Sequence, residues 1–95
     1  MTDQQLDTLA RIASDTAMRA AADYVRVHGL AVPDYETASQ VLRAEVKLVI
    51  GPALDDAKQA FAAGMGHVAE CTFKAAMVAA GFKAAKEFAT QKEAA

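Results

Sequence analysis

The chain has 95 residues and a formal charge of −2; 24 residues are alanine, tryptophan is missing and only two residues are proline. This composition is typical of one small helical domain and argues against a β-sandwich or a disordered chain. The single cysteine, Cys71, excludes an intramolecular disulfide, and the lack of a basic block argues against nucleic acid or anionic lipid as a partner.

The first predicted helix covers about residues 3–28. Small apolar residues recur along one side of it at helical spacing, and Gly29 follows as a stop signal. The opposite side carries charges of alternating sign, and neighbours four residues apart can pair on the helix surface for about 0.3 kcal/mol each. We interpret this charged series as a solvated face. Its members are Asp7, Arg11, Asp15, Arg19 and Asp23.

The second predicted helix covers about residues 34–50. Pro33 suits its first turn and Asp34 suits its N-cap. Its apolar stripe is wide enough to be covered by two neighbouring helices. We expect the helix to end before Gly51-Pro52, because a residue that precedes proline is disfavoured in the helical conformation.

The third segment, residues 52–91, shows the most regular pattern in the chain. Apolar residues and glycines follow one another in steps of three and four from Leu54 to Ala89. Such a run predicts one long helix with a coiled-coil-like seam. A second apolar stripe runs along another side of the same segment, so the predicted helix needs two sets of neighbours.

Two glycines interrupt this third segment. Each costs about 1 kcal/mol relative to alanine inside a helix, so Gly64 and Gly66 are a possible break. The steps of three and four do not slip across them, however, which favours a continuous helix. The expected fold is therefore all-α: a small antiparallel bundle of three helices with a long C-terminal helix, or of four helices if the chain breaks at 64–66.

The length of the third segment predicts self-association. A helix from Leu54 to Ala89 would be about 54 Å long, more than a compact monomer of this size can flank. We therefore expect a homodimer. Its predicted contact residues, each of which fits an intramolecular core equally well, are Phe61, Gly64, Val68, Cys71, Ala75, Val78 and Phe82. The second stripe, a candidate surface for another protein, contains Phe73, Met77 and Phe88.

The sequence predicts no catalytic, cofactor or metal site. The Glu-x-x-His pairs of di-iron bundles, the Gly-x-Ser-x-Gly elbow and the phosphate-binding loop are all missing. His67, Glu70 and Cys71 are spaced to touch on a helix, yet a closed zinc site needs more ligands than these. We interpret Cys71 as a buried thiol of the seam, with His67 and Glu70 facing outward.

These features favour a non-enzymatic protein–protein interaction module that self-associates. The alternative is a small DNA-binding regulator with a helix-turn-helix in residues 34–63, although Asp55 and Asp56 would repel phosphates where its reading helix begins. A third possibility is a helix that lies on a membrane surface from Phe61 to Phe88, although its lysines are matched by glutamates.

The N-terminal segment is polar and acidic, unlike a signal peptide. The apolar run from Ala75 to Phe82 is bounded by lysines and is far too short to cross a bilayer. We therefore expect a cytoplasmic protein without a membrane span. Its small size and simple composition suggest an accessory protein of a phage or mobile element, such as an inhibitor of a host system, although no motif identifies one.

Overall fold

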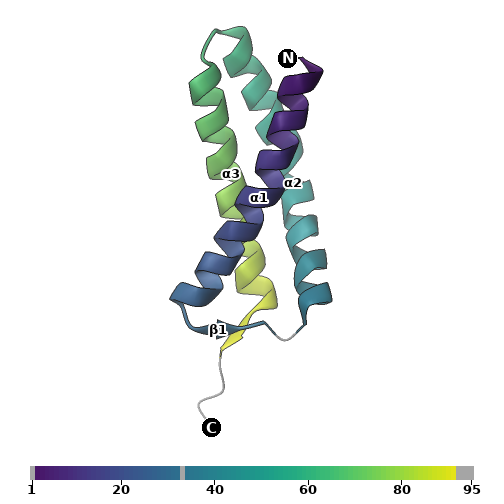
Figure 1. The fold of residues 1–95 in the computed structure, drawn as a ribbon, viewed down its shortest axis with the longest axis vertical. Coiled ribbons are helices and arrows are strands. Elements are labelled where there is room, and N and C mark those ends of the chain that lie inside the picture. The colour runs from purple at the N-terminus through teal and green to yellow at the C-terminus, as the bar shows by residue number, and fades with distance from the viewer. Residues whose placement is uncertain (1, 33, 92–95) are drawn as a thin grey trace.

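The computed structural model describes residues 2–32 and 34–91. Within them, three helices lie side by side along the long axis of a molecule that measures 55 × 21 × 17 Å (Figure 1). The predicted all-α bundle of three helices is therefore confirmed. The elements in chain order are α1 (Asp3–Val27), β1 (Leu30–Ala31), α2 (Tyr35–Ala62), α3 (Gly66–Phe88) and β2 (Thr90–Gln91).

Helix α1 begins with a capping box and ends one residue before the predicted bound. The Thr2 hydroxyl accepts a hydrogen bond from the Gln5 N–H, and the Gln5 side chain accepts one from the Thr2 N–H. Two free donors at the helix start are thereby satisfied. Gly29 follows the helix with a φ of 61°. The predicted charged face is exposed throughout, and Arg11 pairs with Asp7 at 3.2 Å.

Helix α2 starts at the predicted N-cap. The Asp34 carboxylate accepts hydrogen bonds from the Thr37 hydroxyl and from the N–H groups of Thr37 and Glu36, and these bonds lower the pKa of Asp34. Because the carboxylate occupies the positive end of the helix dipole, it also stabilises the first turn. Pro33, the predicted companion of this cap, lies outside the described residues.

The predicted helix end at Gly51-Pro52 is wrong, because α2 continues to Ala62. Proline removes one helical hydrogen bond and costs about 3 kcal/mol in a helix interior. Gly51 lessens the strain, since it has no Cβ to crowd the proline ring. The apolar stripe also keeps its phase across the pair, so that Val46 before it and Ala57 after it pack on the same core. Tertiary packing outweighs the local helix-breaking signal here.

The predicted continuous helix across Gly64 is also wrong, and the alternative break there is correct. Gly64 has a φ of 76°, a left-handed conformation that glycine adopts at little cost. Its N–H donates to the Phe61 carbonyl at 3.0 Å, and the Met65 N–H donates to the Ala60 carbonyl at 2.8 Å. These two bonds form a Schellman motif, which ends α2 and lets α3 run back beside it. Because α2 has no earlier break, the described chain has three helices rather than four.

Helix α3 packs against both other helices and supplies two of the three largest fully buried side chains. These are Phe73 and Met77, which pack with Leu9 of α1 and with alanines of α2. Near the other end of α3, Gly81 lies so close to α1 that a Cβ there would overlap the backbone of Ala17. Small residues therefore let α1 and α3 approach closely.

Two short strands close the end of the bundle that holds the link between α1 and α2. Strand β1 pairs with β2 in antiparallel fashion, with Leu30 opposite Gln91 and Ala31 opposite Thr90. The third helix accordingly ends at Phe88, and not at residue 91 as predicted. The strand pair ties the end of α3 to the α1–α2 link.

Candidate interaction surfaces

The outer face of α3, opposite its buried face, carries five of the seven residues predicted for self-association. At its two ends, Val68 and Phe82 are 48% and 40% exposed. Between them, Cys71 and Ala75 are exposed and Val78 is half-buried. Two neutral residues lie on the same face, and we call the whole set the outer stripe. It consists of Val68, Cys71, Thr72, Ala75, Val78, Ala79 and Phe82.

The other two residues predicted for self-association do not belong to the outer stripe. Phe61 lies on α2, half-buried against the core, and its ring would be 3.2 Å from a Cβ at Gly66. Gly64 forms the turn between α2 and α3. The prediction puts both on the seam because it assumes a continuous helix, and the turn at Gly64 takes them out of the helical register of α3.

The predicted partner surface on the second stripe is wrong for Phe73 and Met77. Both are buried in the core by α1 and α2, so that no partner can reach them. The third residue, Phe88, is half-buried at the C-terminal end of α3. Helical spacing correctly grouped Phe73 with Met77, but it did not show that the chain's own helices cover them.

The length argument for a dimer does not hold. The described helices are shorter than the predicted one, with 28 residues in α2 and 23 in α3. Both fit within a molecule whose long axis is 55 Å. Self-association stays a prediction, and it now rests on the outer stripe alone.

Cys71 is exposed and not buried as predicted. Its Sγ lies 3.6 Å from Nε2 of His67, one helical turn earlier. Glu70 is half-buried and lines a shallow depression next to the first turns of α1. Among the residues that the structure describes, no three side chains of the metal-binding types cluster together. One thiol beside one imidazole does not amount to a metal centre.

The structure removes the basis of two alternatives. The helix-turn-helix predicted in residues 34–63 needs a turn, whereas α2 crosses that region without interruption and carries Asp55 and Asp56 in its C-terminal half. The surface helix predicted from Phe61 to Phe88 is interrupted by a turn, and the inner side of α3 is buried. In the described part of the chain, no helix combines the length and apolar character that a membrane crossing requires.

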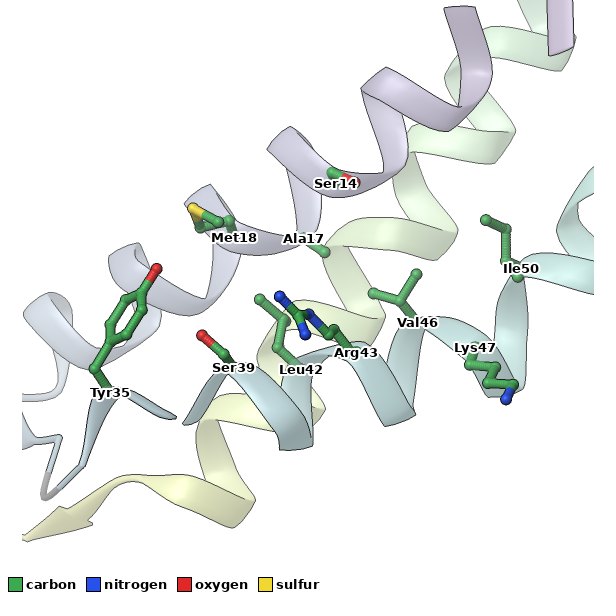
Figure 2. A pocket seen from close by; sticks show the side chains of 10 residues that line it. All are labelled: Ser14, Ala17, Met18, Tyr35, Ser39, Leu42, Arg43, Val46, Lys47 and Ile50. Carbon is green, nitrogen blue, oxygen red and sulfur yellow. The ribbon is translucent and has the colours of Figure 1, made fainter. Parts of the chain in front are cut away.

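A groove between α1 and the N-terminal half of α2 is a second apolar surface. These two helices contact each other far less than either contacts α3. A hollow of about 450 Å³ therefore opens between them, and an extension of about 280 Å³ leads towards Phe88. Figure 2 shows Leu42 and Val46 of α2 pointing across the groove towards α1. At its mouth, Met18 is 54% exposed and Tyr35 is 76% exposed.

The charged side chains that line this groove are all basic. Arg43 and Lys47 of α2 lie along one part of it, and Arg26 of α1 lies at the other. Among the described residues that line it, none is acidic. Ser14 and Ser39 add hydroxyl groups. The groove therefore has an apolar floor and a basic rim, in which Arg26 is already paired with Asp23 at 3.1 Å.

Sequence reasoning missed the groove because it assigned two covering neighbours to the stripe of α2. The signal that could have revealed it is a mismatch in side-chain size. Helix α1 turns alanines such as Ala17 and Ala21 towards the groove, whereas α2 turns Leu42 and Val46. Alanine is too short to fill the space between two helices that a third helix holds apart.

One carboxylate pair lies where α2 meets α3. Glu45 is only 6% exposed, and the Lys83 Nζ lies 3.3 Å from its Oε2. A hydrogen bond shared with Glu45, followed by desolvation and the charge of Glu45, raises the pKa of Glu87, and Lys83 partly opposes this. The ion pair links the two helices, and the nearby Glu87 adds a protonation-dependent contact.

The outer stripe and the groove share no residue, and each presents apolar side chains to solvent. Exposed apolar residues that stand alone are ordinary, but contiguous ones mark sites of contact with other molecules. Comparisons with protein-family models, with curated proteins and with solved structures yield no match.

Proposed function

We propose that the protein is a non-enzymatic interaction module that self-associates as a homodimer through the outer stripe of α3. The observation that carries this proposal is an uncharged stripe about four turns long, from Val68 to Phe82, in which every residue but the half-buried Val78 is exposed. The opposite side of the same helix is buried. Covering such a stripe removes apolar surface from water, the dominant favourable term in protein association. A dimer of this kind is in keeping with the accessory role predicted from the small size of the chain.

The outer stripe is complementary to itself about Ala75. When two α3 helices cross there in antiparallel orientation, Val68 of each copy lies opposite Phe82 of the other. Cys71 lies opposite Ala79 in the same way. A twofold interface requires this reciprocity. Large residues at the ends of the stripe and small ones at its centre let the helix axes approach to about 8 Å.

Charge favours the antiparallel over the parallel arrangement. Lys83 and Lys86 flank the C-terminal end of the stripe. A parallel pair would bring the lysines of both copies together at one end. An antiparallel pair separates them by more than about 20 Å, beyond the screening length of physiological salt. The helix dipoles also favour the antiparallel pair, because each positive end then lies beside a negative end.

The molar mass of the full chain, measured by light scattering after gel filtration, tests this proposal. At about 100 µM we expect twice the mass of one 10.0 kDa chain, with a fall towards one chain on dilution. Ala75→Glu places two carboxylates at the twofold centre and should yield a monomer with an unchanged helical circular dichroism spectrum. Ala44→Glu, the same change at an exposed position of α2, should leave the dimer intact.

Two outcomes would overturn the proposal. One is a monomeric mass for the unmodified chain across this concentration range. The other is a dimer that survives Ala75→Glu. A dimer that Ala44→Glu disrupts and Ala75→Glu does not would move the interface from α3 to α2.

Cysteine crosslinking tests the orientation of the two copies. In a Cys71→Ala background, Ala75→Cys brings two thiols together at the twofold centre and should give a disulfide-linked dimer on mild oxidation. The unmodified chain should crosslink far less, because Cys71 lies opposite Ala79 in the antiparallel arrangement. Efficient crosslinking through Cys71 alone would instead indicate a parallel pair.

A further inference from the structure

The groove between α1 and α2 has the length of a short helix. Its lining extends from Ser14 to Arg26 along α1 and from Tyr35 to Ile50 along α2, which corresponds to about 20 Å at the helical rise. A helix of about 14 residues spans that distance. Since α3 already packs against both walls, a helix in the groove would convert the three-helix arrangement into a four-helix one.

The groove stays open because its two walls cannot close on each other. Gly81 allows α3 to lie directly on the backbone of α1 at Ala17, and the Lys83–Glu45 ion pair holds α3 to α2. The alanines of α1 are too short to bridge the remaining gap. Leu42, Val46 and Ile50 of α2 are therefore only half-buried, and a side chain from outside can contact them.

The charge of the rim indicates which kind of helix fits. Arg43, Lys47 and Arg26 line the groove. Arg26 is paired with Asp23 at 3.1 Å, so the charge available to a partner comes mainly from Arg43 and Lys47 of α2. We propose that the groove binds one amphipathic helix of a partner protein, with its apolar side in the groove and acidic residues along its edges. Helix-in-groove recognition of this kind combines spaced apolar anchors with complementary charge. The groove shares no residue with the outer stripe, so this inference does not depend on the homodimer.

A second copy of this chain fits the groove less well than an acidic helix does. The chain itself offers the outer stripe of α3, and the cations Lys74 and Lys86 flank it, together with Lys83, which is paired with Glu45. Placing that stripe in the groove would set these lysines against a basic rim. Like charges placed opposite each other suppress association.

Two designed peptides test the proposal by fluorescence anisotropy on the full-length protein. Both are capped helices of about 15 residues with leucine at every third or fourth position, and they differ only in carrying glutamate or lysine along the edges. We expect the glutamate peptide to bind about tenfold more tightly at low salt, with the difference shrinking as salt is added. The double variant with Arg43→Glu and Lys47→Glu should reverse this preference.

A variant pair locates the binding site. Met18→Glu places a charge at the mouth of the groove on a side chain that is already half-exposed, so we expect it to fold and to weaken the glutamate peptide about tenfold or more. Ala10→Glu puts the same side chain on an exposed part of α1 outside the groove and should leave binding unchanged.

The proposal is overturned if neither peptide binds at about 1 mM, if both bind equally at low salt, or if the two variants have the same effect. A further result would reassign the groove. If Met18→Glu lowers the molar mass of the protein alone and Ala75→Glu does not, the groove holds a second copy. That outcome would refute both the partner helix and the dimer through the outer stripe. If instead neither peptide binds and Ala75→Glu gives a monomer, only the partner helix is refuted.

Discussion

The two faces of α3 resemble each other in the sequence and have opposite fates in the structure. The inner face, with Phe73 and Met77, is buried by α1 and α2. The outer face, with Val68 and Phe82, remains about half exposed. In a three-helix bundle each helix has only two neighbours, and both lie on the same side of it. A helix with two apolar stripes must therefore leave one of them uncovered, and that stripe is available for contact with another molecule.

The largest expected effect is on the free energy of unfolding, when one phenylalanine on each face of α3 is replaced by alanine. Phe73→Ala should cost about 3–5 kcal/mol, because it leaves a cavity in the core. Phe82→Ala should cost less, about 1–2 kcal/mol at a concentration where the chain is monomeric, because the ring is 40% exposed and loses its contact with the Tyr24 ring of α1. Urea unfolding followed by circular dichroism measures both.

If Phe73→Ala does not fold, Phe73→Leu provides the comparison, with an expected loss of about 1 kcal/mol or somewhat more. Equal losses for the same substitution at Phe73 and at Phe82 in the monomer would contradict the assignment of the two faces. A loss at Phe82 that grows with protein concentration would instead report its burial in the dimer.

The second prediction concerns the close approach that closes the inner face. Gly81→Ala should cost about 2 kcal/mol, because the new Cβ meets the backbone of Ala17 and lies 2.9 Å from the Cβ of Ala20. In an uncrowded helix the same change stabilises by about 1 kcal/mol, so the sign of the stability change alone distinguishes a crowded Gly81 from an uncrowded one. Thermal melting of the two proteins, followed by circular dichroism, decides the matter. A stabilised Gly81→Ala protein would show that α3 does not lie directly on α1.

The fold class, the bounds of α1 and its solvated face could be predicted because they depend on local signals. Alternating charges at four-residue spacing identify an exposed face without any knowledge of neighbours. Whether the chain breaks at Gly51-Pro52 or at Gly64 could not be predicted in the same way. Gly51-Pro52 carries the stronger breaking signal and remains helical, whereas Gly64 carries the weaker signal and forms the turn. The deciding quantities are the phase of the apolar stripe of α2, which is kept across Gly51-Pro52, and the positive φ at Gly64.

A pair of glycine-to-alanine changes tests this difference between the two sites. Gly64→Ala should cost about 1 kcal/mol, because alanine is strained in the left-handed conformation that ends α2. Gly51→Ala should stabilise by somewhat less than 1 kcal/mol, roughly the gain in an exposed helix reduced by crowding against Pro52. Opposite shifts of the melting temperature would support both assignments. A gain at Gly64 would restore the continuous helix that the heptad pattern predicts.

The interaction surfaces were predictable only in part. Helical spacing shows which residues share a face, so five residues of the outer stripe were grouped correctly, as were Phe73 and Met77. Spacing does not show which face the chain itself will cover, and this depends on where α1 and α2 pack. The groove has still less of a local signature, since it results from the unequal distances among three helices.

The smallest expected effect lies at the edge between the two faces of α3, where Glu87 meets Glu45. Because the pKa of Glu87 is raised in the folded state, its protonated form is favoured by folding. The resulting contribution to stability is present below the ordinary pKa of 4.5 and is lost as pH rises through the raised value. Glu87→Gln keeps a hydrogen-bond donor for Glu45 at every pH. We therefore expect it to raise the melting temperature slightly at neutral pH and to have no advantage near pH 4.5. Glu70→Gln removes the same charge from α3 at a position away from Glu45 and corrects for the change in net charge. If the advantage of Glu87→Gln over Glu70→Gln persists unchanged into acid, the two carboxyl groups do not share a proton, and the edge of α3 is held by the Lys83–Glu45 ion pair alone.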